Sequence, residues 1–244
     1  MTGRRIIATI ADGSTDHEII YEFIRRGVTR PPTEEGDCGW QHVPLRQNVH
    51  QGIRDHVRAA GQEGYTLCGR AALALRGTLL QALLSARADL EAQAGRHNGL
   101  RATDLIVLSS DAEETVPGRS GVVTDPWAIT LAAVVHAAID DWQDKSIEWG
   151  LDPTALPLVV PFVPFPSTDV LVAAAKGVRD LRGRRGREMK RDLYGVEDLS
   201  QLRADDLSEK ALRHFGPQTA VCVCREVPEA RDLLRPLLFA QAPA

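Results

Sequence analysis

Cysteines, aromatic residues and long apolar runs are all scarce in this sequence. Only four of its 244 residues are cysteines, and 5% are aromatic. The cysteines lack the dense spacing of a secreted disulfide scaffold, so reduced thiols are the simplest interpretation. No apolar run approaches the roughly 20 residues needed to cross a bilayer, and residues 1–10 lead into a strand pattern rather than a signal sequence. We therefore expect a cytoplasmic protein.

Net charge is also low. A formal charge of −4 gives no global field that would mark a nucleic-acid binder, so any such surface must come from local clustering. Residues 176–191 are the one strongly basic stretch. With 43% hydrophobic residues, the chain is long enough for one sizeable core but not for two full domains. The sequence thus predicts a single domain over residues 1–244.

Several familiar site motifs are missing from the sequence. There is no Gly-Lys-Ser/Thr element of a P-loop, and no Gly-x-Ser-x-Gly elbow for covalent catalysis. Cys38, His42 and His50 could be taken for zinc ligands, but the second tight pair of a closed zinc site is missing. Zinc is therefore disfavoured.

Strand and helix patterns alternate along the chain. Short apolar runs predict strands at 6–10, 105–108, 158–163 and 219–224. The prolines of the third strand favour a sheet edge or an early end of the strand. Helical spacing and caps predict helices at 17–26, 70–94, 126–142, 170–175 and 207–215, and a last helix from 228. Residues 28–66 show no sustained period, apart from a possible helix at 49–60, and are interpreted as an irregular insertion. This alternation predicts an α/β fold with a mainly parallel sheet.

Acidic residues follow two of the predicted strands. Asp12 and Asp16 come after the first strand, and Asp111 and Glu113 come after the continuous apolar run at 105–108. Ligands of open α/β sheets gather beyond the carboxyl ends of the strands. Because oxygen ligands suit hard divalent ions, we expect a Mg²⁺ or Mn²⁺ site there. An Asp-Gly turn with an ordinary helix cap, and a solvated acidic loop, are the structural alternatives.

The two acidic motifs resemble the signature of the Toprim superfamily of topoisomerases, primases and overcoming-lysogenization-defect nucleases. That signature is a strand ending in Glu-Gly-x-x-Asp and a later strand ending in Asp-x-Asp. Here the motifs read Asp12-Gly13-Ser14-Thr15-Asp16 and Asp111-Ala112-Glu113, with an aspartate for the first glutamate and a glutamate for the last aspartate. The chain is most similar to small Toprim-like proteins encoded beside ATPases in bacterial antiviral operons. A later block at 187–195 is similar to a C-terminal block of that group.

The resemblance implies a Toprim-like (Rossmann-like) core with a helical insertion at about 28–100 and a C-terminal extension at about 176–244. It implies that Asp12 acts as general acid/base, that Asp12, Asp111 and Glu113 hold Mg²⁺ (or Mn²⁺), and that Asp16 belongs to the same catalytic group. The implied activity is phosphodiester cleavage by a nuclease subunit of an antiviral defence system, with a separately encoded ATPase as partner.

Basic residues in the stretch at 176–191 are the candidate nucleic-acid contacts: Arg182, Arg184, Arg185, Arg187 and Lys190. DNA is favoured over RNA as the ligand. A solvated or partner-facing surface is the alternative interpretation of these charges.

Two other functions stay open for the whole chain. One is a catalytically degenerate regulatory subunit that docks an ATPase, and the other is a metal-dependent enzyme that acts on a nucleotide or another small phosphate.

Overall fold

The computed structural model describes residues 5–11, 13–27, 38–44, 69–93, 100–102, 104–111, 131–181, 184, 186–196, 202 and 204–239. The strands are β1 (Arg5–Ala11), β2 (Cys38–Pro44), β3 (Leu105–Ser109) and β4 (Leu158–Phe162). The α-helices are α1 (Ser14–Gly27), α3 (Gly69–Gln93), α4 (Leu131–Glu148), α5 (Val170–Ala175), α6 (Gly186–Tyr194), α7 (Ala204–Lys210), α8 (Pro217–Glu226) and α9 (Ala230–Phe239). Two short 3-10 helices, η2 (Pro153–Ala155) and η5 (Leu212–His214), complete this set.

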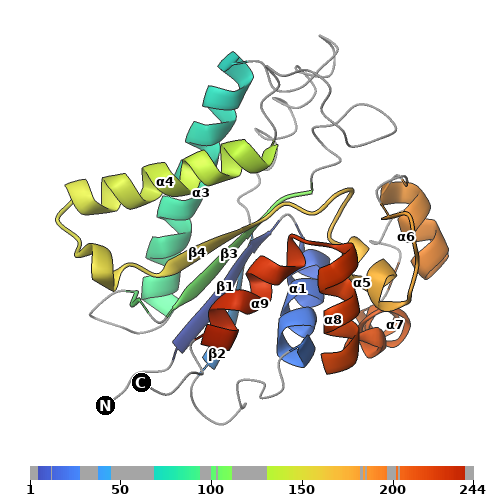
Figure 1. The fold of residues 1–244 in the computed structure, drawn as a ribbon. Coiled ribbons are helices and arrows are strands. Elements are labelled where there is room, and N and C mark those ends of the chain that lie inside the picture. The colour runs from blue at the N-terminus through green and yellow to red at the C-terminus, as the bar shows by residue number, and fades with distance from the viewer. Residues whose placement is uncertain are drawn as a thin grey trace.

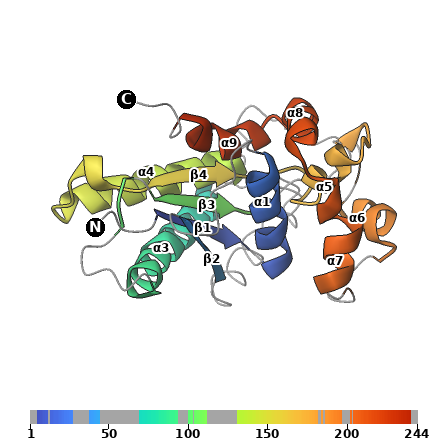
Figure 2. The same ribbon diagram turned by 90° about the horizontal axis from the view of Figure 1, so that it is seen from below.

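The four strands form one parallel sheet in the order β2-β1-β3-β4. Helices α3 and α4 cover one face of the sheet, while α1, α8 and α9 lie on the other (Figures 1 and 2). The predicted α/β fold with a parallel sheet flanked by helices is therefore confirmed. Helices α5, α6 and α7 lie beyond the carboxyl ends of the strands, next to α1 and α8 (Figure 1).

The side of β1 on which the chain adds its next strand changes after β2. The chain passes from β1 through α1 to β2 on one side, and then adds β3 and β4 on the other side. Such a reversal is a topological switch point, where the loops after the two flanking strands diverge and ligands of doubly wound sheets bind. In this protein the switch point lies at the carboxyl ends of β1 and β3.

Strand β3 is buried on both faces, as its continuous apolar run predicts. Leu105 and Val107 pack into the cluster formed with α1 and α5 to α9, whereas Ile106 and Leu108 pack against α3 and α4. All five residues of β3 are buried. Because successive side chains of a strand point to opposite faces of the sheet, this short strand contributes to both halves of the core. Packing on both faces fixes the position of its carboxyl end.

Of the two edge strands, β4 agrees with its prediction and β2 does not. β4 lies at one edge, as the prolines at 161 and 164 predict. At the other edge, β2 occupies residues 38–44, so the interpretation of 28–66 as irregular was wrong there. The sequence CGWQHVP has no clear period, and main-chain pairing with β1 over seven residues defines the strand instead. The possible helix at 49–60 lies outside the described residues.

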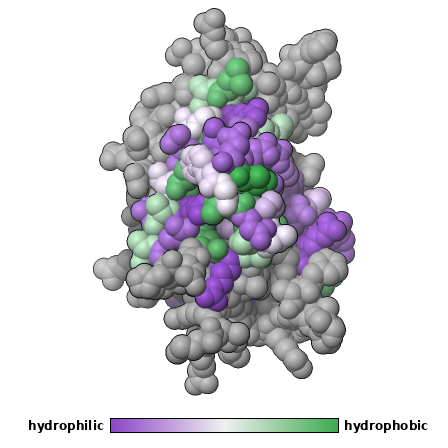
Figure 3. Space-filling view, turned by 90° about the vertical axis from the view of Figure 1, so that its left-hand side faces the viewer, coloured by the Kyte–Doolittle hydropathy of each residue, from purple (hydrophilic) through white to green (hydrophobic). Residues whose placement is uncertain are grey.

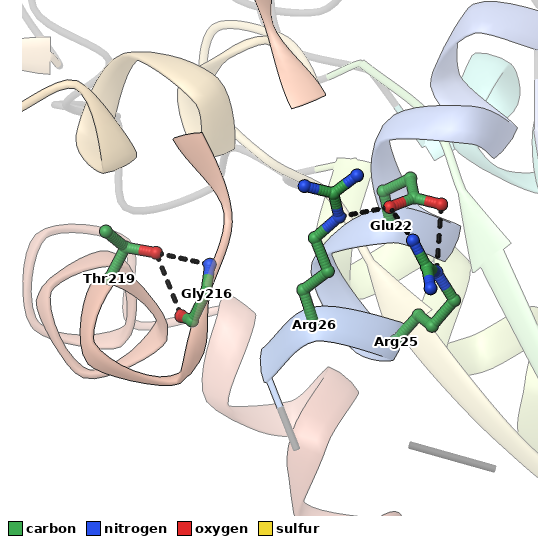
Figure 4. A network of polar contacts seen from close by, with 5 residues as sticks. All are labelled: Glu22, Arg25, Arg26, Gly216 and Thr219. Atoms are coloured by element: carbon green, nitrogen blue, oxygen red, sulfur yellow. Dashed lines mark hydrogen bonds and ion pairs between the residues drawn. The ribbon is translucent and has the colours of Figure 1, made fainter. Parts of the chain in front are cut away.

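The strand predicted at 219–224 is wrong, because these residues belong to helix α8. Its N-terminus carries Pro217 at the first turn, and the Thr219 hydroxyl accepts a 2.7 Å hydrogen bond from the Gly216 main-chain N–H (Figure 4). Ala220 and Val223 are buried while Val221 is 73% exposed, which is helical rather than alternating burial. The alternating letters of TAVCVC resembled a strand, but the proline and threonine of the helix start outweigh them.

Helix α1 ends in a charged network beside the start of α8. Glu22 accepts 3.0 and 2.8 Å hydrogen bonds from Arg25 and a further bond from Arg26 (Figure 4). Burial of Glu22 would raise the pKa of its carboxyl, but these bonds outweigh burial and hold that pKa below its ordinary value. The network pairs both arginines with one carboxylate of their own helix.

Three large apolar side chains are exposed where α4 ends and β4 begins: Ile147, Trp149 and Leu158. Figure 3 views the molecule from this side, and the hydrophobic patches there are interrupted by hydrophilic ones. This end of the fold is therefore not a continuous apolar face. Within the residues that the structure describes, no helix has the length and apolar character of a membrane span.

Candidate active site at the carboxyl ends of the strands

Asp111 lies at the switch point, one residue beyond the buried Ser110 that follows β3. Its Oδ1 accepts a 3.0 Å hydrogen bond from the main-chain N–H of Thr168 and a 3.3 Å bond from the Thr168 hydroxyl. Ser110 donates its N–H to Phe162 O at 3.3 Å, which continues the pairing of β3 and β4 past the strand end. The loop after β4 thus orients the carboxylate that follows β3.

A second carboxylate, Asp169, lies in that same loop and was not among the predicted site residues. It is 1% exposed, yet its Oδ1 accepts a 2.8 Å bond from the Tyr194 hydroxyl and its Oδ2 a 3.1 Å bond from Ser167. The Lys190 ammonium lies 3.6 Å from the same Oδ2. Buried charges of this kind are tolerated when they are paired and hydrogen-bonded.

Asp169 does not cap the helix that follows it. Asp169 occupies the N-cap position of α5, but its backbone is helical and its side chain makes no capping hydrogen bond. The carboxylate instead turns to Tyr194 and Lys190 on α6, because a charged hydrogen-bonded pair is stronger than a cap bond to a main-chain N–H. The sequence signal that could have revealed it is an aspartate just after a third parallel strand, at the same sheet edge as Asp111.

Tyr194 connects these acids to the first motif. Burial raises the pKa of its phenol far above the ordinary value, and the charges of Asp169 and then Asp16 raise it further. The phenol therefore stays protonated and donates to Asp169. Asp16, half-buried in the first turn of α1, is near enough to act on the same hydroxyl. We call Asp16, Asp111 and Asp169, which follow β1, β3 and β4 along the chain, the acidic site.

The predicted metal ligands are only partly within the described residues. Asp111 is described, whereas Asp12 and Glu113 lie outside. Among the residues that the structure describes, no three His, Cys, Asp or Glu side chains form a group that could hold a metal ion. Cys222 and Cys224 lie on α8, the first exposed and the second half-buried.

The predicted nucleic-acid contacts do not form one uniform array. Arg184 forms a 2.6 Å ion pair with Asp192, Arg187 is exposed on α6, and Lys190 turns to the buried Asp169. Arg182 and Arg185 lie outside the described residues. Lys190 is therefore the member of this group that the fold brings beside the acidic site.

No protein-family model, curated protein or solved structure matches this chain.

Proposed function

We propose that this chain is a Mg²⁺- or Mn²⁺-dependent nuclease with a Toprim-like core, the subunit of a prokaryotic antiviral system that works with a separate ATPase. One observation carries the proposal: Asp111 follows the buried strand β3 at the switch point of a doubly wound sheet, and the loop after β4 orients its carboxylate. Sites at this place in α/β folds bind ligands, and a carboxylate offers the oxygen ligand that a hard cation prefers.

The donor chemistry near Asp111 fits such an ion. Asp111 offers carboxylate oxygen, and the adjacent Ser110 is 3% exposed with no hydrogen-bond partner for its hydroxyl among the described residues. In the proposal, Asp12 and Glu113 complete the ligand set. A bound divalent ion supplies charge stabilisation for a phosphate oxygen during hydrolysis.

In the proposal, the remaining side chains orient the metal-binding carboxylate or neutralise charge on the substrate. Thr168 orients Asp111 through two hydrogen bonds, so the carboxylate is held without moving during the reaction. Lys190 brings a positive charge to the edge of the acidic site, where it would neutralise a phosphodiester oxygen. Asp169 holds that ammonium and is held in turn by Tyr194. Substrate anions would otherwise be repelled by the carboxylates.

Cleavage assays with Mg²⁺ or Mn²⁺ on plasmid DNA, single-stranded DNA and RNA test this function. Asp111→Asn preserves shape and removes the charge, and we expect its cleavage rate to fall by about 100-fold or more. Asp144→Asn is the matched control, because Asp144 is exposed on α4 at the other side of the sheet. Equal rates for wild type and Asp111→Asn would refute the assigned site.

A further inference from the structure

Four basic side chains gather at the C-terminal end of α6. Lys176 follows α5, Lys210 ends α7, and Arg213 and His214 belong to η5. Lys176 Nζ donates to Leu193 O at 3.2 Å, and Lys210 Nζ donates to Tyr194 O at 3.5 Å. These two oxygens are consecutive main-chain acceptors, so both ammonium groups lie at the C-terminal end of α6. We call these four residues the cationic cluster.

The acids within the described residues do not pair with the cationic cluster. Across the part of the chain that the structure describes, none of its four members forms an ion pair with a carboxylate. Burial lowers the pKa of Lys176, and the charge of Arg213 lowers it further. Burial also lowers the pKa of His214, and both of these neighbouring cations add to that effect. Like charges therefore repel one another here.

Capping of α6 explains only part of this arrangement. Cations near a helix C-terminus are stabilised by about 0.3–1 kcal/mol each, which accounts for the two lysines bonded to Leu193 and Tyr194. Arg213 is exposed, and His214 Nε2 is buried with no hydrogen-bond partner among the described residues. Arg76, by contrast, is paired with Asp141. Arg213 therefore adds positive charge beyond what the helix end needs.

Tyr194 connects this cluster to the acidic site. Its main-chain oxygen accepts the bond from Lys210, while its hydroxyl donates to the buried Asp169. Tyr194 therefore contacts both the cluster and the loop that orients Asp111. Helices α5, α6 and α7 lie together on this side of the fold (Figures 1 and 2). A ligand long enough to pass both places would meet cations first and carboxylates next.

We propose that the cationic cluster binds a phosphate group, and that this group belongs to the backbone of a nucleic-acid strand whose neighbouring phosphodiester reaches the acidic site. The choice of a polynucleotide rather than a free phosphate rests on the proposed function. Several clustered cations that no described acid pairs with favour the binding of a polyanion.

The test uses the full chain with Lys210→Gln and Arg213→Gln combined. Both side chains are exposed, and neither belongs to the acidic site. The matched control combines Lys145→Gln and Arg225→Gln, which removes the same charge from exposed positions on α4 and α8. Binding of a labelled short single-stranded DNA is followed by fluorescence anisotropy over a range of salt concentrations, with EDTA present to prevent metal-dependent cleavage. Circular dichroism verifies that both variants fold.

Each phosphate contact on a single strand contributes about 0.7 to the slope of log K against log salt. Loss of two contacts should lower that slope by about 1.4 and weaken binding roughly 14-fold near 0.15 M salt, while the control stays close to wild type. Equal losses in both variants, or no DNA binding by wild type, would overturn the proposal.

Titration with pyrophosphate separates the two phosphate sources. If the cluster variant loses pyrophosphate binding but keeps its affinity for DNA, the assignment to a nucleic-acid strand is wrong. If the cluster variant binds DNA weakly while wild type cleaves nothing with Mg²⁺ or Mn²⁺, the cluster stands and the nuclease function fails. If wild type cleaves DNA and the cluster variant binds it like the control, the cluster assignment alone fails.

Discussion

The hydrogen bond between Tyr194 and Asp169 makes a quantitative prediction about stability. The Tyr194 hydroxyl donates to the Asp169 carboxylate at 2.8 Å, and both residues are at least 97% buried, with 3% and 1% exposure. Tyr194→Phe removes the donor and leaves the ring in place. Asp169 then keeps only its contacts with Ser167 and Lys190.

A hydrogen bond to a charged group contributes about 1.5–3 kcal/mol, so Tyr194→Phe should lower the free energy of unfolding by about 2 kcal/mol. For a chain of this length that corresponds to a fall in Tm of roughly 4–8 °C. Urea denaturation measures the free energy directly, and differential scanning calorimetry measures the Tm. The substitution should leave the secondary structure unchanged.

A double-mutant cycle tests whether the loss comes from this pair. Asp169→Asn retains the shape and an acceptor but removes the charge, so Tyr194→Phe should cost about 1 kcal/mol less in the Asn background than in wild type. Strictly additive effects, or a loss below about 0.5 kcal/mol for Tyr194→Phe alone, would refute a charged hydrogen bond between these side chains.

Alkaline pH gives an independent readout of the same pair. The pKa of the Tyr194 phenol is raised by burial and by Asp169, whereas an unfolded tyrosine ionises near 10. Above about pH 10 the unfolded chain therefore loses a proton that the folded chain keeps, and stability falls as pH rises. Tyr194→Phe should flatten this decline between about pH 9 and about pH 11. An identical pH dependence in both proteins would contradict the raised pKa.

Two further predictions concern the helices that flank this region. Val223→Ala removes two methyl groups from a fully buried side chain on α8 and should lower the free energy of urea unfolding by about 2 kcal/mol. Val221→Ala, at a 73% exposed position on the same helix, should lower it by less than about 0.5 kcal/mol. The reverse order would contradict the observed side of α8 that is buried. Glu22→Gln should cost about 1 kcal/mol near neutral pH. The pKa of Glu22 in the folded state is below 4.5, so the extra stability of wild type over the variant should disappear as pH falls from about 4.5 through that pKa. A stability difference that stays constant down to about pH 2 would contradict the lowered pKa.

Local sequence patterns predicted most elements that meet the centre of the sheet. The strand at 105–108 needed no tertiary information, because a short apolar run that is buried on both faces has few alternatives. The helix predicted at 70–94 is observed as Gly69–Gln93 for a similar reason, since helical spacing of its leucines leaves one buried side. The helix predicted to end near Trp142 continues to Glu148, and its predicted start at 126 lies outside the described residues.

Errors arose where two local signals competed or where the signal was not local. At 219–224 an alternating apolar pattern competed with the helix start at Gly216 and Pro217, and the helix start prevailed. At 38–44 the strand depends on main-chain pairing with β1, which no period in the sequence reveals. Edge strands of this kind are defined by their neighbour.

The sequence by itself determined the fold class and the position of Asp111, because a buried strand followed by a carboxylate is a local pattern. Asp16 was likewise identified from its motif after β1. Only the tertiary structure decided that Asp169 faces Tyr194 and Lys190 rather than its own helix, and that Lys176 and Lys210 meet Arg213 and His214. These residues are brought together from separate helices. The reason is physical: a charged side chain selects its partner by three-dimensional proximity and by the energy of the pair, and neither is encoded in spacing along the chain.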